Sequence, residues 1–89
     1  MPYAVVLTKS ALKELDVLNT RQRDKIIEHI RQIENDPRNH GARKLKGRSE
    51  YKLRVGDYRI VYGIDDAEKK VTIFLVDDRK HVYKKLKRK

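Results

Sequence analysis

The stretch Tyr51-Lys-Leu-Arg-Val-Gly-Asp-Tyr-Arg-Ile-Val-Tyr62 predicts a β-hairpin whose two faces differ in character. Gly56 and Asp57, set between β-branched and aromatic runs, mark a two-residue turn. Centring the turn there gives the cross-strand pairs Val55 with Tyr58, Arg54 with Arg59, Leu53 with Ile60, Lys52 with Val61, and Tyr51 with Tyr62. Because side chains alternate along a strand, one face is apolar and the other is basic. Like charges directly opposite each other are destabilising, so the basic face favours an anionic ligand. The alternative is a solvated face on which long basic side chains extend into water.

The charge of the chain is concentrated in its second half. The 89 residues are enough for a single domain, 1–89, with one modest core. They include 23 Lys and Arg against 13 Asp and Glu, a formal net charge of +10. Residues 38–59 hold eight basic and two acidic side chains, and residues 79–89 hold seven basic and no acidic ones. This distribution indicates a surface that meets phosphate groups. A membrane surface would attract the same charge, but no apolar insertion face or lipidation signal accompanies it.

Several kinds of site are absent from the sequence. The chain contains no cysteine, which excludes disulfides, thiolate zinc sites and a cysteine nucleophile. Its three histidines are widely separated and match no metal-ligand spacing, so we predict no metal and no cofactor. No signal-peptide pattern opens the chain, which favours a cytoplasmic protein.

The pattern of apolar residues predicts an α+β fold. Residues 3–7 form a short apolar run that we expect to be a strand well inside a sheet. Two amphipathic helices follow. The first is capped by Thr8, and its apolar stripe consists of Ala11, Leu12, Leu15 and Leu18. The second is capped by Asn19 or Thr20 and ends before Pro37, and its stripe consists of Ile26, Ile27, Ile30 and Ile33. Residues 35–47 read as a loop, and residues 71–76 as an apolar strand at the centre of the sheet. We therefore predict a helical hairpin packed on a small, mainly antiparallel sheet, in the order β-α-α-β-β-β, with a short basic C-terminal tail.

Three motifs together resemble the RelE branch of the RelE/ParE toxin superfamily. They are the segment Lys44-Leu-Lys-Gly47, the hairpin 51–62, and the segment Val76-Asp-Asp-Arg-Lys-His-Val-Tyr83. The resemblance covers essentially the whole chain. It implies a toxin of a type II toxin–antitoxin system that cleaves mRNA in the ribosomal A site and inhibits translation. The implied partners are the ribosome, mRNA and an acidic, partly disordered antitoxin that forms a hetero-oligomer with the toxin.

The same resemblance assigns roles to individual residues. Lys52 and Arg54 are the basic pair of the hairpin, Arg59 binds a phosphate, Arg79 lies near the leaving group, and Tyr83 orients a base. The candidate RNA contacts around them are the basic residues Lys44, Lys46, Arg48, Lys80 and Lys84. Some members of the family have lysine in place of Arg54, and a guanidinium is a poor general base. Lys52 is therefore the candidate base, since a lysine among other cations can lose its proton.

Two other functions stay open at this stage. One is a toxin of the same fold directed against DNA gyrase. The other is a basic nucleic-acid-binding domain without catalytic activity, which composition alone does not distinguish from a nuclease.

Overall fold

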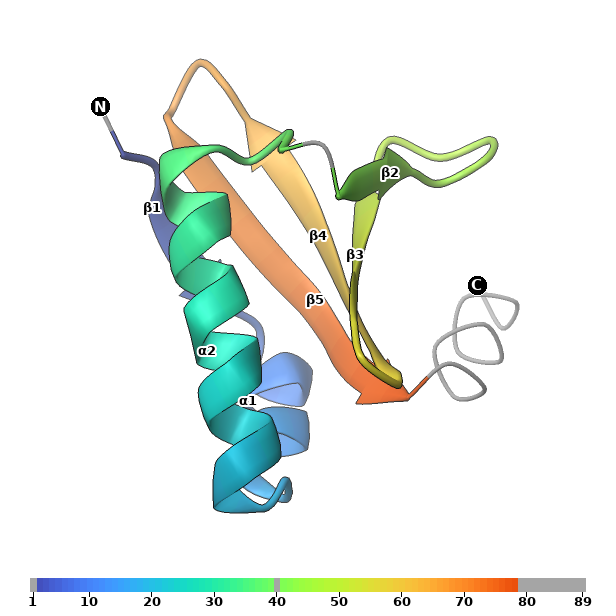
Figure 1. Ribbon diagram of the computed structural model, residues 1–89. Helices are drawn as coiled ribbons and strands as arrows, with labels where there is room; N and C mark the ends of the chain where they lie inside the picture. Colours follow the sequence, from blue (N-terminus) through green and yellow to red (C-terminus); the bar gives the residue numbers. More distant parts are fainter. Residues whose placement is uncertain (1, 40, 79–89) are drawn as a thin grey trace.

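The structure is a computed structural model, and it describes residues 2–39 and 41–78. Two helices and five strands are found in this part of the chain (Figure 1): β1 Ala4–Leu7, α1 Lys9–Asp16, α2 Thr20–Asn35, β2 Ala42–Lys44, β3 Tyr51–Val55, β4 Tyr58–Asp65 and β5 Lys70–Asp78. The strands form one sheet in the order β1-β5-β4-β3-β2. The β1–β5 pair is parallel, and the other pairs of neighbouring strands in the described chain are antiparallel. The predicted α+β class and the mainly antiparallel sheet are confirmed.

Local capping signals set the bounds of both helices. The Thr8 hydroxyl accepts a hydrogen bond from the backbone N–H of Ala11 at 3.2 Å, and the Asn19 side chain accepts one from Gln22 at 2.9 Å. α2 ends at Asn35, ahead of Pro37, as predicted. Neither described helix has the length and apolar character needed to cross a membrane.

The helices cover one face of the sheet. Their buried residues Ala11, Leu15, Ile26 and Ile33 pack against the apolar face of the strands, and the strand side of this core comprises Leu53, Val55, Ile60, Tyr62, Val71, Ile73 and Val76. Leu12 was predicted to lie in the core as part of the first stripe, but it is 51% exposed, so this prediction is wrong. The short α1 has room to turn only one narrow stripe towards the sheet, and Ala11 and Leu15 occupy it.

Two predicted sheet positions are wrong. β1 lies at an edge, with Val6 47% exposed, because β5 is its one partner among the described strands. The centre of the sheet is β4, while β5 is an interior strand between β1 and β4. Each edge strand is short, and the longer strands occupy the interior positions, where both of their edges are hydrogen-bonded.

A further strand extends the predicted order to β-α-α-β-β-β-β. Ala42–Lys44 was expected to be loop, but it pairs with Tyr51–Leu53 at the far edge of the sheet from β1 (Figure 1). Its three residues have no apolar alternation. Backbone pairing with the free edge of β3 creates this strand, which is why the side-chain pattern did not predict it.

The loop between β2 and β3 is anchored on the face of the sheet opposite the helices. Leu45 is 8% exposed and packs with Val61 and the partly buried Leu75. This small apolar cluster lies beside the basic side chains of the hairpin, because Val61 shares a face with Lys52. It holds the loop close to the candidate site.

Candidate functional site

The hairpin has the register that its sequence predicts. Arg54 pairs with Arg59 and Lys52 with Val61, and the positive φ of 60° at Gly56 fits the tight turn. The apolar partners Leu53 and Ile60 are buried in the core. The basic side chains Lys52, Arg54 and Arg59 therefore share the face of the sheet that the helices leave uncovered.

These side chains line a pocket of about 360 Å³, here called the basic pocket, together with Gly41 and Arg43. Arg43 stands opposite Lys52 in the β2–β3 pairing and so projects from the same face. Three strands thus contribute four cations to one concave site. An anion in such a site is attracted by all four charges, and the surrounding protein screens them less than bulk water does.

Arg59 is the most buried cation of the pocket, at 6% exposure. Within residues 2–39 and 41–78 its guanidinium forms no hydrogen bond and no ion pair. Its register neighbours are Arg54 on β3 and Asp77 on β5, so a negative charge on one side offsets only part of the repulsion on the other. Burying a cation without a direct partner is unfavourable, and a phosphate oxygen in the pocket would supply that partner.

The other cations of the pocket are more accessible. Lys52 is partly buried, whereas Arg54 is exposed and its Nε lies 3.4 Å from the carbonyl oxygen of Gly56. Arg43 is also exposed. The site therefore combines one buried cation with three more accessible ones, an arrangement that suits binding of an anionic group by several donors.

The predicted RNA contacts Lys44, Lys46 and Arg48 lie at the end of β2 and in the β2–β3 loop, outside the lining of the basic pocket. Arg48 donates from Nε to the Glu50 carboxylate at 2.6 Å, and this bond lowers the pKa of Glu50 below its usual range. Lys44 pairs with Tyr51 across β2 and β3, so it projects from the opposite face to Lys52. Lys46 is exposed near Gly47 at the tip of the loop. None of the three lines the basic pocket.

The remaining predicted site residues are Arg79, Lys80, Tyr83 and Lys84, and all four lie outside the described residues, as does the basic tail. Arg43 is the cation of the basic pocket that the sequence did not predict. Its only signal would have been a strand at 42–44, and no alternation marks one there. In the described part of the chain no three His, Cys, Asp or Glu side chains gather as a metal-binding group.

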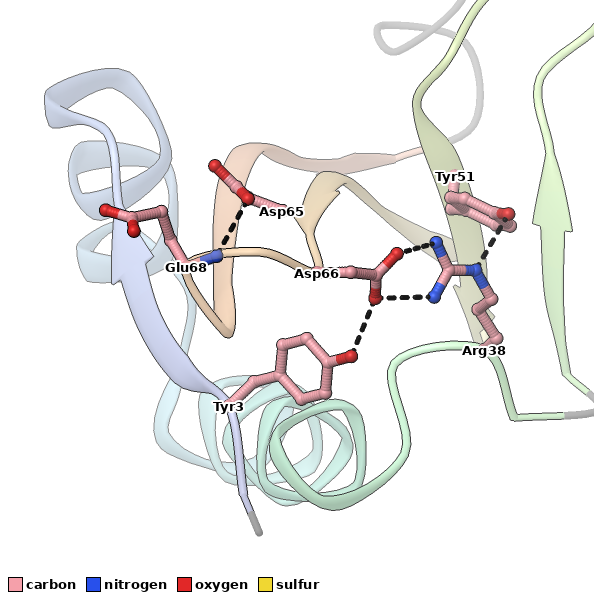
Figure 2. Close-up of polar contacts among 6 residues, drawn as sticks. All are labelled: Tyr3, Arg38, Tyr51, Asp65, Asp66 and Glu68. Atoms are coloured by element: carbon pink, nitrogen blue, oxygen red, sulfur yellow. Dashed lines mark hydrogen bonds and ion pairs between the residues drawn. The ribbon is translucent and has the colours of Figure 1, made fainter.

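A polar network holds the segment that leads into β2 (Figure 2). The Arg38 guanidinium donates to both carboxylate oxygens of Asp66, at 3.0 and 2.9 Å, and to the Tyr51 hydroxyl at 3.2 Å. Asp66 also accepts from the Tyr3 hydroxyl at 2.7 Å. These donors, Arg38 first, lower the pKa of Asp66 to about 2, and the same carboxylate raises the pKa of Tyr3. The network ties the segment before β2 to β3, to the β4–β5 turn and to the start of β1.

A buried hydrogen bond reinforces this anchor. The Tyr62 side chain is fully buried, and its hydroxyl donates to the Pro37 carbonyl oxygen at 2.6 Å. Burial raises the pKa of Tyr62 to about 12. Tyr62 also stacks on Tyr51, with ring centroids 6.1 Å apart. Pro37 and Arg38 are thus held at adjacent positions, and they fix where the chain enters β2.

Comparison with known proteins gives a consistent result. Residues 5–83 match the model of the ParE toxin of the type II toxin–antitoxin system parDE. The chain is 33% identical over 89 residues to Toxin RelG of Mycobacterium tuberculosis, a match that covers 96% of this chain and 100% of the relative.

Solved structures of toxin–antitoxin complexes share the fold. The RelBE2 complex of Mycobacterium tuberculosis matches with a TM-score of 0.79 and 29% identity, over 89% of this chain and 100% of the matched one. The intact RelBE complex of E. coli matches with a TM-score of 0.75 and 29% identity, over 85% of this chain and 95% of the matched one. The archaeal RelE–RelB complex of Pyrococcus horikoshii OT3 matches with a TM-score of 0.79 and 27% identity, over 89% and 97%. The chain is a toxin of the ParE family of type II toxin–antitoxin systems and belongs to the RelE/ParE superfamily.

Proposed function

We propose that this toxin is a ribosome-dependent endoribonuclease that cleaves mRNA in the A site and so inhibits translation. The observation that supports this proposal best is Arg59, a buried cation without a direct partner in the described chain, in a pocket with three further cations. A pocket of this kind suits a phosphodiester that becomes more negative as it reacts.

The proposed reaction is attack of the RNA 2′-hydroxyl on the adjacent phosphorus. The 2′ oxygen loses its proton, the bond from phosphorus to the 5′ oxygen of the next nucleotide breaks, and that oxygen takes up a proton. Arg59 and Arg54 bind the phosphate and stabilise its added charge, and Lys52 is the candidate base. Two further roles remain predictions: Arg79 near the leaving group and Tyr83 stacked on a base.

Dependence on the ribosome follows from the weakness of these groups as acids and bases. The described pocket contains no histidine and no carboxylate among its lining residues. Exact placement of the message can replace much of the missing proton-transfer chemistry, because a well-aligned attack lowers the barrier by several kcal/mol, up to about 7–11 kcal/mol in the best cases. The ribosome supplies such placement, and its location makes the cytoplasm the site of action.

A cell-free translation assay tests the function. Two messages are compared that differ only in a premature stop codon near the middle of the reading frame, and cut sites are mapped by primer extension. We expect cuts throughout the frame in the first message and only upstream of the early stop in the second. Arg59→Ala should lose the cuts, while Arg21→Gln, which removes an exposed arginine of α2, should keep them.

The same preparation is tested against DNA gyrase, the target proposed for the ParE branch. Intact messages together with inhibited supercoiling would assign the gyrase function to this chain and refute the nuclease. Intact messages, active gyrase and RNA binding would instead indicate a binding domain without catalysis.

We also propose that a cognate antitoxin inhibits this toxin, as the complexes of its structural relatives suggest. An acidic, partly disordered chain suits the net charge of +10. Charge should then raise the association rate, and apolar contacts should set the lifetime of the complex. Raising the salt concentration is expected to slow association more than it speeds dissociation, which stopped-flow mixing measures. A dissociation rate that rises steeply while association stays constant would contradict this scheme.

A further inference from the structure

We propose that the basic pocket binds two consecutive phosphates of the RNA, and that Arg43 on β2 binds the second one. This inference rests on the proposed function, because it names how the same site holds its substrate. The nucleotide chain is expected to cross the face of the sheet that α1 and α2 leave uncovered, from β4 towards the β2 edge.

The register divides the four cations into two pairs. Arg54 and Arg59 face each other across β3 and β4, and we call them the inner pair. Arg43 and Lys52 face each other across β2 and β3, and we call them the outer pair. Both pairs line the same pocket.

The spacing of the pairs matches an extended RNA strand. Lys52 and Arg54 are next-but-one residues of β3, so the pairs are offset by about 7 Å along the strand and by about 5 Å across it, or about 8 Å between their centres. One nucleotide repeat of an extended sugar–phosphate chain has a similar length. A single phosphate held by the inner pair would therefore lie about one nucleotide repeat away from Arg43, which leaves Arg43 available for the next phosphate.

The size and charge of the pocket support two phosphates. Each pair sets two like charges directly opposite each other, which is unfavourable by a few tenths to about 1 kcal/mol per pair. One phosphate per pair removes both repulsions. The pocket volume of about 360 Å³ equals roughly a dozen water molecules at about 30 Å³ each, which is more than one phosphate group fills.

Arg43 has a defined position although β2 is short. Ahead of the strand, Pro37 and Arg38 are held by Tyr62 and Asp66, as Figure 2 shows for the Arg38 bonds. After it, Leu45 is buried against the sheet. The strand is thus fastened at both ends, and the loss of freedom on RNA binding is largely confined to the Arg43 side chain.

The test is a chemical double-mutant cycle on the whole chain. The ligands are 2′-O-methyl trinucleotides, which bind without being cut, with either two phosphodiesters or one phosphodiester and one neutral methylphosphonate in place of either linkage. Affinities are measured by NMR titration at low salt. Arg43→Gln removes the charge at an exposed edge position, and Arg43→Lys restores the charge without the forked donor.

Wild-type protein should bind the doubly charged trinucleotide about fivefold more tightly than the analogue that lacks the outer charge, the order expected for one solvent-accessible ion pair. In Arg43→Gln this preference should fall below about twofold, and in Arg43→Lys it should return in part. The slope of log affinity against log salt should decrease by about 0.7 for Arg43→Gln, as for one lost contact to a single strand. Arg21→Gln should change none of these values.

An undiminished preference in well-folded Arg43→Gln, or an equal loss for charged and neutral ligands, would overturn the second phosphate site. Cleavage on translating ribosomes is measured in parallel, so the two claims can fail separately. Cut messages without the Arg43 coupling overturn the two-phosphate site alone. Coupling without cut messages supports the site and refutes the proposed nuclease.

Discussion

Replacing Arg59 by methionine is expected to stabilise the fold and to abolish the activity. The side chain is 6% exposed and forms no hydrogen bond or ion pair with another described residue. Replacing a buried ion pair by apolar side chains of similar volume is often neutral or stabilising by about 1–4 kcal/mol, and a buried cation without a direct partner has the desolvation cost without the compensating attraction. The pocket admits water, and Asp77 lies opposite Arg59 on β5, so both features place the gain at the lower end of that range.

Relief of the repulsion from Arg54 adds a few tenths of a kcal/mol, so the free energy of unfolding should rise by about 1–2 kcal/mol in total. For a domain of this size the melting temperature should increase by about 5–10 °C. The cleavage rate on ribosomes should fall by about 10²–10³-fold, the usual effect of losing one preorganised donor to a developing negative charge. Stability and activity thus move in opposite directions.

The assay combines urea unfolding followed by circular dichroism with single-turnover cleavage on stalled ribosomes. Arg59→Ala serves as a comparison, since it removes the same charge but leaves a cavity, and its stability should be close to that of the wild type. Arg21→Met on the exposed face of α2 should alter neither quantity by much. If Arg59→Met lowers the free energy of unfolding by more than about 1 kcal/mol, Arg59 is a structural residue and this reasoning is refuted.

Three further predictions concern the framework of the pocket. Tyr62→Phe should cost about 1–3 kcal/mol at neutral pH, because the buried Pro37 carbonyl loses its donor. Folding raises the pKa of Tyr62 to about 12, so the stabilisation by its hydroxyl is lost as pH rises from about 10 through 12. The difference in free energy of unfolding between wild type and Tyr62→Phe should therefore shrink in urea titrations at alkaline pH, and a constant difference would contradict this prediction. Folding lowers the pKa of Asp66 to about 2, so the stabilisation by its carboxylate is present above pH about 4 and is lost as pH falls towards 2. The free energy of unfolding of Asp66→Asn should not show this decrease between about pH 4 and pH 2. An acid profile identical to that of the wild type would argue against the prediction. Leu45→Ala should cost about 2–3 kcal/mol in thermal or urea unfolding and weaken RNA binding, since Leu45 anchors the loop after β2; full binding with normal stability would exclude an anchoring role.

Features that depend on residues close together in the chain could be predicted from the amino-acid sequence. The register of the hairpin follows from the two-residue turn at Gly56 and Asp57, and the period of two then places Lys52, Arg54 and Arg59 on one face. Likewise, Thr8 and Asn19 cap their helices because a side-chain oxygen and a backbone N–H three residues later interact locally. The α+β class followed from the two helical stripes and the apolar strands.

The order of the strands in the sheet became known from the three-dimensional fold. The first strand was expected inside the sheet but lies at its edge, and the stripe residue Leu12 is exposed. Apolar patterning reports that a segment has a buried face, but the order of strands depends on contacts between segments far apart in the chain. The network of Arg38 and Asp66 is of the same kind, because its two residues are 28 positions apart.

The extent of the basic pocket was also decided in three dimensions. The sequence identified three of its four cations, yet it could not show that Arg59 is buried without a direct partner, because burial depends on what the rest of the fold places around the strand. Arg43 enters the pocket because three residues without any alternation pair with the free edge of β3. Such pairing is made by backbone groups, which are the same in every residue except proline, so no pattern of side chains could have predicted it.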